Sequence, residues 1–151
     1  MKKNQEQIDY CNILTTNTRE IYDKIGSVFC PCLNEKVTFN AKGFHHLLYE
    51  PIGTPRSVKE KIHKLILFPL AIPVIKNAKK VDEERTLILP NRKKSIHPKN
   101  AKYTALVATV GKNRDVKVKV ILLKIGHGKL IFWSIMRLTK GKNKNQKTSR
   151  K

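Results

Sequence analysis

Two adjacent histidines, His45 and His46, are the side chains of this chain best suited to acid–base chemistry. Imidazole changes its charge near neutral pH, so it can act as a general acid or base. Asn40 is a favourable helix N-cap, and residues 41–50 after it predict a helix. Neighbouring side chains on a helix point about 100° apart, so one histidine faces the core and the other a sheet or solvent. The pair is a candidate catalytic site, with capping or packing as the alternative.

A second candidate feature is a set of cations on predicted strands and helix ends. Lys117 and Lys119 lie on one face of a predicted strand whose other face carries valines. Arg56 precedes a long predicted helix, and Arg85 begins another strand. Stabilising a phosphorane needs clustered cations, and arginine binds two phosphate oxygens at once. We therefore take Arg56, Arg85 and Lys119 as candidate catalytic residues and Lys117 and Lys124 as candidate phosphate-binding residues. For each one alone, a solvated sheet face is the alternative.

Several other side chains are suited to binding a nucleotide. Trp133 lies in an apolar strand, where it either packs in the core or, if exposed, stacks on a base. Ser134 follows it and is a further candidate catalytic residue by position. Candidate binding residues with a core or turn role as the alternative are Tyr49, Tyr103 and His127.

The cysteines and acidic residues argue against metal chemistry. Cys30 and Cys32 form a Cys-x-Cys pair, which lacks both the usual two-to-four-residue spacing and the second pair of a structural zinc site. Buried thiols beside a turn are the preferred interpretation. The chain has no glycine-rich phosphate loop and no hydrolase elbow, and its 11 acids make a two-metal nuclease unfavourable. We expect neither a metal nor a cofactor.

The charge of the chain indicates an anionic partner. The 151 residues include 32 Lys and Arg against 11 Asp and Glu, a formal net charge of +21. Nucleic acid is the commonest partner of such a chain, and an anionic membrane surface is the second. Lysine outnumbers arginine by far, as an AT-rich genome would also produce. The longest apolar stretch, residues 65–75, has two prolines and is too short to span a membrane. We expect a cytoplasmic protein with no membrane contact.

The elements that position these residues predict an α+β fold. Residues 1–27 read as a polar leader with a short helix within 13–25, and residues 137–151 as a disordered basic tail. Between them, residues 28–136 form one domain. Residues 29–34 read as a turn and 37–40 as a short strand, and a capping box at Ser57 and Glu60 starts a second helix, which Pro69 and Pro73 kink or end. Strands are predicted over 85–89, 103–110, 116–125 and 129–136. We expect a four-stranded antiparallel sheet with the helices packed on one face and the other face free.

This layout resembles the barnase–EndoU–colicin–RelE-like nuclease superfamily, in particular its phage-associated and toxin-type branches. The resemblance covers residues 28–136. It is carried by Val37-Thr-Phe-Asn-Ala-Lys-Gly-Phe-His-His-Leu-Leu48, Arg56, a long helix and four strands that end in Ile125-Gly-His-Gly-Lys-Leu-Ile-Phe-Trp-Ser134. It implies RNA cleavage without metal by attack of a ribose 2′-hydroxyl on the adjacent phosphate. His45 and His46 carry over as acid–base candidates.

Two functions follow as hypotheses. The first is a toxin-type endoribonuclease acting on tRNA or ribosome-associated mRNA, with an antitoxin or immunity protein as a partner. The second is a non-catalytic RNA- or ribosome-binding protein that uses the same basic face. An interaction protein whose charge comes from genome composition is a third alternative.

Overall fold

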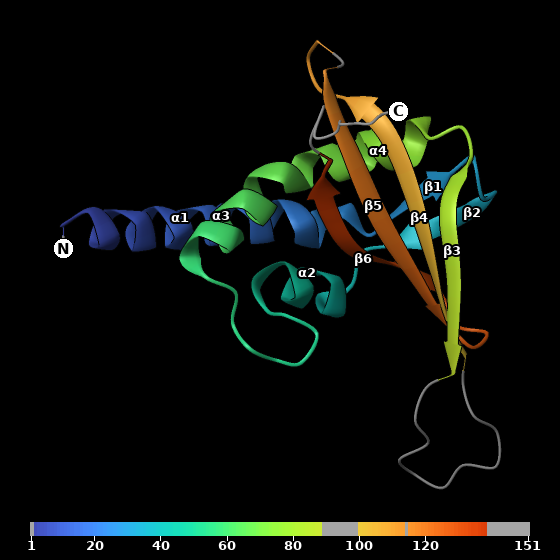
Figure 1. Ribbon diagram of the computed structural model, residues 1–151, viewed down its shortest axis with the longest axis horizontal. Helices are drawn as coiled ribbons and strands as arrows, with labels where there is room; N and C mark the ends of the chain where they lie inside the picture. Colours follow the sequence, from blue (N-terminus) through green and yellow to red (C-terminus); the bar gives the residue numbers. More distant parts are fainter. Residues whose placement is uncertain (1, 89–99, 114, 139–151) are drawn as a thin grey trace, which may run out of the picture.

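The computed structural model describes residues 2–88, 100–113 and 115–138, and its architecture is α+β (Figure 1). The elements in chain order are α1 (Lys2–Ile25), β1 (Ser27–Cys30), β2 (Glu35–Thr38), α2 (Ala41–Leu48), α3 (Val58–Leu67), a 3₁₀ turn (Phe68–Leu70), α4 (Ala71–Asn77), β3 (Val81–Ile88), β4 (Asn100–Val110), β5 (Val116–Ile125) and β6 (Leu130–Arg137). The α+β class is confirmed. The four-stranded sheet is wrong, because the sheet has six strands in the order β1-β2-β6-β5-β4-β3.

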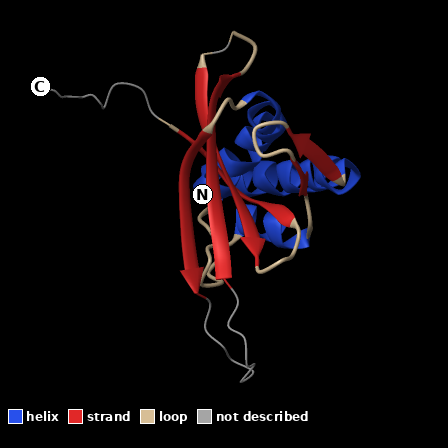
Figure 2. Ribbon diagram, turned by 90° about the vertical axis from the view of Figure 1, so that its right-hand side faces the viewer, coloured by secondary structure: helices blue, strands red, loops and turns tan. Residues whose placement is uncertain are grey.

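The last four strands form an antiparallel meander in which each strand pairs with the next along the chain. The alternating sequence of residues 116–125 predicted β5 with the observed bounds. Its even-numbered residues, such as Val118 and Val120, are buried in the core. Its odd-numbered residues lie on the opposite face, because successive strand side chains alternate. The helices lie on one side of the long strands, as Figure 2 shows, so this second face is free of helices over β3 to β5.

Two strands outside the expected four-stranded sheet change its edge: β1 was not predicted, and β2 overlaps the short strand predicted over 37–40. β1 and β2 pair as an antiparallel hairpin around Pro31. β2 then pairs with β6 in parallel, at only two positions, Val37 with Leu130 and Thr38 with Ile131. In the described part of the chain, the rest of β6 therefore has no strand partner on that side. An unpaired strand edge exposes backbone groups that other elements must cover.

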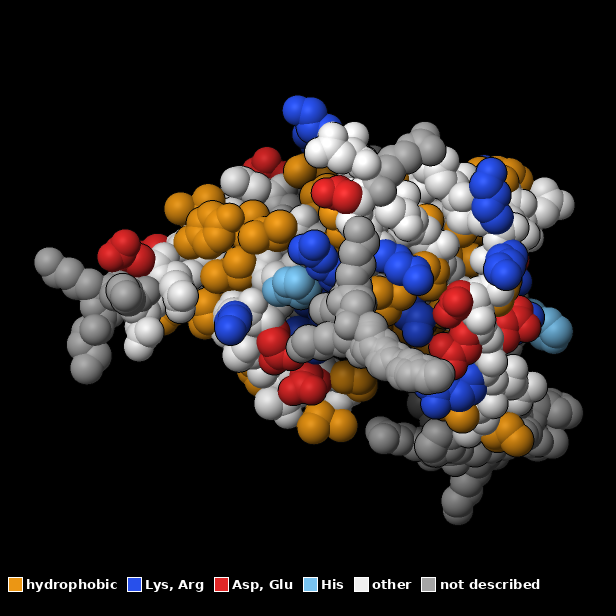
Figure 3. All heavy atoms as spheres, turned by 45° about the horizontal axis from the view of Figure 1, so that its top comes forward, with side chains coloured by type: hydrophobic (Ala, Val, Ile, Leu, Met, Phe, Trp, Pro, Cys, Tyr) orange, Lys and Arg blue, Asp and Glu red, His pale blue; other side chains and the backbone are white. Residues whose placement is uncertain are grey.

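The N-terminal helix is part of the domain and is not a separate leader. α1 begins at Lys2, well before the short helix expected within 13–25. The buried residues Cys11, Thr18 and Tyr22 lie on one face of α1 and hold it against the domain. The outer flank of α1 keeps exposed apolar side chains, and Figure 3 shows a patch of hydrophobic side chains on its left, toward the N-terminal end. The helix within the expected leader at residues 1–27 therefore packs on the domain through this buried face.

The two helices beside the sheet begin where the sequence predicted. Asn40 caps α2 by accepting a hydrogen bond from the Gly43 amide, and Ser57 and Glu60 form the capping box of α3. Pro69 lies in the 3₁₀ turn that ends α3, while Pro73 is accommodated in the first turn of α4. These caps fix the first residue of each helix. They therefore determine which of its side chains face β6.

Five aromatic rings form the centre of the core beneath the helices. The rings belong to Tyr22, Phe39, Phe44, Phe68 and Phe132. The Tyr22 hydroxyl donates a hydrogen bond to the Asn40 carbonyl at 2.6 Å, which joins α1 to the start of α2. Because Phe44 belongs to α2 and Phe132 to β6, this cluster holds α2 in contact with β6.

A β-bulge in β6 decides which of its side chains reach the free face. The register with β5 shifts between Ile121 and Leu122, and Trp133 is the extra residue without a partner. Phe132 and Ile135 are both buried in the core although they are three residues apart. Strict alternation would place them on opposite faces, so the bulge resets the alternation.

Some expectations lie outside the described residues. They are the last residue of the strand expected over 85–89 and nearly all of the basic tail, from residue 139 onward. Among the helices that the structure describes, none is both long enough and apolar enough to cross a membrane.

Candidate functional site

A hollow of about 480 Å³ lies where α2 and α3 meet the unpaired edge of β6 and the free face of the sheet. We call it the edge hollow. Its lining residues are His46, Pro51, Arg56, Lys64, Glu83, Arg85, Leu87, Tyr103, Ala105, Ile121, Trp133, Ser134 and Met136. Six of the twelve residues selected from the sequence are in this set: His46, Arg56, Arg85, Tyr103, Trp133 and Ser134. They come from five separate elements or loops, so only the fold brings them together.

The strand side of the edge hollow follows from the sheet register. Successive partners across β3, β4, β5 and β6 are Glu83, Ala105, Ile121 and Ser134, and Arg85 pairs with Tyr103 two positions along the same strands. The bulge at Trp133 turns both Trp133 and Ser134 toward the same hollow. A row of residues across four strands therefore forms one wall.

The helix side is anchored to backbone carbonyls. The Arg56 Nε donates a hydrogen bond to the His46 carbonyl at 3.1 Å. The Lys64 Nζ donates one to the Ile135 carbonyl at 2.5 Å, on the part of β6 that lacks a strand partner. Lys64 thus covers the open edge and at the same time places an ammonium group in the hollow.

The edge hollow is positively charged. Arg56, Lys64 and Arg85 line it against one carboxylate, Glu83. Glu83 is also 3.4 Å from the Lys119 Nζ, which partly neutralises it. Cations held together in a partly buried space attract phosphate more strongly than the same cations spread over a solvated surface. Lys119 is not among the residues that line the hollow, and it contacts the hollow only through Glu83.

His46 is buried with its ring stacked on Trp133, the centroids 4.5 Å apart. Among the described residues, neither ring nitrogen has a hydrogen-bond partner. Burial, and then the nearby charges of Arg56 and Lys64, lower the pKa of His46 to about 4. The imidazole is therefore neutral at physiological pH, with a free lone pair. A buried polar group without a partner costs stability, and such groups are often functional.

Lys64 is the site residue that the sequence analysis missed. Burial, and then the charge of Arg56, lower the pKa of its ammonium to about 8. In a helix with apolar residues at Ile62 and Leu65, a lysine between them reads as part of the solvated face. The only signal is its position next to the apolar stripe, which is too common to select it.

The burial of His46 should make the protein less stable as the pH decreases. Its folded pKa of about 4 lies below the ordinary 6.5, so between these values only the unfolded chain takes up the proton. The free energy of unfolding must then fall as pH decreases through this window. His46→Gln should reduce this fall by about 3 kcal/mol in urea titrations, since each pKa unit corresponds to about 1.4 kcal/mol. The exposed His45→Gln is the control; equal pH dependence in wild type and His46→Gln would refute the assignment.

The other selected residues lie outside the edge hollow. His45 is exposed and stacks on Tyr49, with 4.2 Å between the centroids, in a different hollow on α2. Lys124 lies on the core side of β5 and forms an ion pair of 2.7 Å with Glu35. Lys117 is near the start of β5, whereas His127 is in the turn after its end, about 30 Å away for an extended strand. One site cannot hold all five residues, because the length of β5 and its register separate them.

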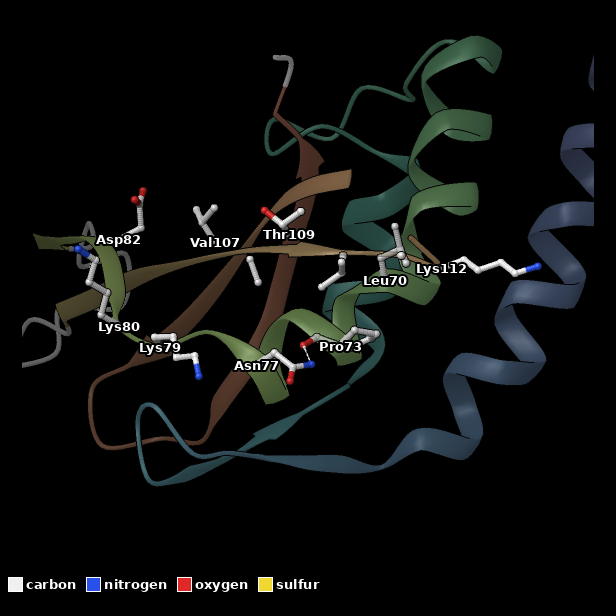
Figure 4. Close-up of a pocket in the computed structure, with 12 residues that line it drawn as sticks. Leu70, Pro73, Asn77, Lys79, Lys80, Asp82, Val107, Thr109 and Lys112 are labelled. Carbon is white, nitrogen blue, oxygen red and sulfur yellow. Dashed lines mark hydrogen bonds between the residues drawn. The ribbon is translucent and has the colours of Figure 1, made fainter. Parts of the chain in front are cut away.

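A larger hollow, of about 880 Å³, lies elsewhere, between α4 and β4. Lys79, Lys80 and Lys112 line it, but their amines point away from one another in Figure 4. The Asn77 side chain is held by its own helix through the Pro73 carbonyl. Because its polar groups do not converge, this hollow is a weaker candidate than the edge hollow.

The cysteines are free thiols, with Cys30 buried and Cys32 half-buried at the β1–β2 turn. Burial raises the pKa of Cys30, which keeps its thiol protonated. Within residues 2–88, 100–113 and 115–138, no group of three or more His, Cys, Asp or Glu side chains could hold a metal ion.

Comparison with known proteins identifies no relative: no family model, no curated protein and no solved structure matches the chain. The function must therefore be argued from the edge hollow itself.

Proposed function

We propose that the protein is a metal-independent endoribonuclease and that the edge hollow is its active site. The observation that carries the proposal is the convergence there of His46 and Lys64, two groups with pKa values shifted to about 4 and about 8, beside two arginines and two aromatic rings. Pairs of titratable groups held apart in pKa are typical of acid–base catalysis. A volume of about 480 Å³ is also within the range of small-ligand sites.

In the proposed reaction, the phosphorus atom of the RNA backbone exchanges its bond to the 5′-oxygen for a bond to the 2′-oxygen of the preceding ribose. The His46 imidazole accepts the 2′-hydroxyl proton, the 2′-oxygen bonds to phosphorus, and the bond to the 5′-oxygen breaks. Lys64 donates its proton to that leaving oxygen. The products are a 2′,3′-cyclic phosphate and a free 5′-hydroxyl.

The remaining side chains bind and stabilise the reacting group. Arg56 and Arg85 hold the negative charge of the phosphorane. Trp133 and Tyr103 offer ring faces to the base on either side of the cleaved bond. Ser134 lies on the strand wall, where its hydroxyl can donate to a phosphate oxygen.

The pKa shifts favour His46 as the base. Between pH values of about 4 and 8, His46 is neutral and Lys64 is protonated, so both start in the required state. The opposite assignment requires a neutral lysine and a protonated histidine together, which is a rare state throughout this range. His46 as base and Lys64 as acid is therefore the assignment that we adopt.

The pH dependence of cleavage tests this proposal. We expect RNA to be cut in the presence of EDTA, with kcat/KM rising through about pH 4 and falling through about pH 8. Circular dichroism at each pH separates loss of rate from loss of folding. Cleavage that stops in EDTA, or a profile that is flat across these two pKa values, would contradict the mechanism.

A second candidate is RNA binding without cleavage. It is favoured by the shielding of both His46 ring nitrogens from solvent, since a base must reach the proton that it removes. Salt-sensitive RNA binding with no cleavage products over hours would establish this second function and exclude the first.

The biological setting belongs to the same proposal. A toxin that cuts tRNA or ribosome-associated mRNA in the cytoplasm should stop growth when its expression is induced, unless an antitoxin or immunity protein is present. The double variant Arg56→Ala, Arg85→Ala should relieve the arrest.

A further inference from the structure

A second hollow, of about 550 Å³, lies on the other side of the His46–Trp133 stack. We call it the α2 hollow. It shares three lining residues with the edge hollow, namely His46, Pro51 and Trp133. The two hollows are therefore neighbouring compartments separated by one stacked pair of rings. A ligand longer than one nucleotide that occupies the first compartment meets the second.

The lining of the α2 hollow is suited to an unpaired base. His45 and Tyr49 are four residues apart on one side of α2, and their rings stack almost parallel, at an interplanar angle of 7°. Both rings line the hollow, and His45 is exposed to solvent. A third flat ring can extend such a stack, because every base has a π-face.

The charges of the α2 hollow favour a ligand with a phosphate backbone. Arg19 and Lys42 line it, against a single carboxylate, Glu50. Arg19 is held by Asp23 at 3.2 Å and lies over the Phe44 ring, 4.8 Å from its centroid, so its guanidinium has a defined position. Aromatic faces beside cations are the usual combination for binding single-stranded nucleic acid.

We propose that the α2 hollow is a subsite for the nucleotide next to the one in the edge hollow, and that the protein's substrate is single-stranded RNA. The His45–Tyr49 pair stacks on an unpaired base, while Arg19 and Lys42 attract the adjoining phosphate. This inference rests on the proposed function, because it assigns the cleaved or bound phosphate to the edge hollow. Base-paired RNA has no free base to offer to the stack.

The test uses a fluorescein-labelled 2′-O-methyl tetranucleotide, which cannot be cleaved, at roughly physiological salt, where exposed charges are screened. Tyr49→Ala and His45→Ala should each weaken its binding by roughly 5- to 100-fold, the usual effect of losing one stacking ring. Tyr10→Ala removes an exposed tyrosine of α1 outside both hollows and should leave binding unchanged. A blunt duplex should bind Tyr49→Ala and wild type equally. Thermal melting verifies folding, and the exposed His45 provides a variant that does not disturb the core.

The possible results distinguish a failure of the α2-hollow subsite from a failure of the proposed function. If Tyr49→Ala and His45→Ala bind the tetranucleotide like wild type while Arg56→Ala binds it at least tenfold more weakly, the subsite is refuted and the edge hollow stands. If duplex binding falls as much as tetranucleotide binding, the preference for single strands is refuted. If wild type does not bind the tetranucleotide at all, the proposed function fails and the inference fails with it.

Discussion

Replacing Lys64 with methionine should lower kcat/KM for RNA cleavage by about 10²- to 10⁴-fold, the usual contribution of a general acid. Methionine keeps an unbranched stem in the same space and removes only the ammonium group. The fall in rate above about pH 8 should also disappear, because the pKa of Lys64 is its proposed cause. Initial rates on a fluorogenic RNA across the pH range measure both effects.

The matched control for this variant is Lys61→Met, which changes another half-buried lysine one turn away on α3. Lys61 does not line the edge hollow, so its loss should change the rate only slightly. Loss of the Lys64 hydrogen bond to the Ile135 carbonyl should cost about 1 kcal/mol of stability. Equal rates for the two variants would remove Lys64 from the mechanism.

Gly43→Ala should destabilise the protein by about 1–3 kcal/mol. In an ordinary helix this change stabilises, by roughly 0.5–1 kcal/mol, so the expected sign is reversed. An added Cβ at Gly43 meets the Tyr22 hydroxyl and the Phe132 carbonyl oxygen, and a backbone oxygen has little freedom to move. α2 must shift away from β6, and His46 must shift with it.

Trp133, the only tryptophan in the chain, reports this shift directly. Its fluorescence should change in Gly43→Ala as the stack with His46 loosens, and chemical denaturation gives the loss of stability. Lys42→Ala, an exposed change on the same helix, should leave both measurements unchanged. A Gly43→Ala protein as stable as wild type, with unchanged fluorescence, would mean that α2 does not need its close approach to β6.

Local patterns in the sequence account for most of the meander and for the helix starts. β5 was predicted with its observed bounds because its first five residues alternate strictly and an apolar β-prone run follows them, and the caps at Asn40 and Ser57 depend only on neighbours. The β1–β2 hairpin was missed, because Pro31 and its flanking cysteines read as a turn and hide the strand at Ser27–Cys30. α1 was shortened because its apolar stripe is sparse near the N-terminus.

Only part of the edge hollow could be predicted from the sequence, because some of its residues acquire their properties only in the folded protein. His46, Arg56 and Arg85 carry chemistry that residue type alone suggests, and all three line the edge hollow. Lys64 acquires its low pKa only from tertiary burial, which no local pattern encodes. Lys124 has the same residue type as Lys64, but the β5 register turns it toward Glu35 and away from the site.

The bulge at Trp133 also affects how related chains are to be recognised. Up to Phe132, even-numbered positions of β6 face the core; from Ser134 on, even-numbered positions face the edge hollow. The core-facing positions of β6 change from even-numbered to odd-numbered at the bulge. The site therefore depends on one extra residue in this strand as well as on residue types. A chain of similar composition that lacks this one residue would keep the serine on the hollow and the following isoleucine in the core, but it would lose the ring that stacks on His46. An alignment gap of one position in β6 would thus mark a protein that shares the sheet without the stacked pair of rings.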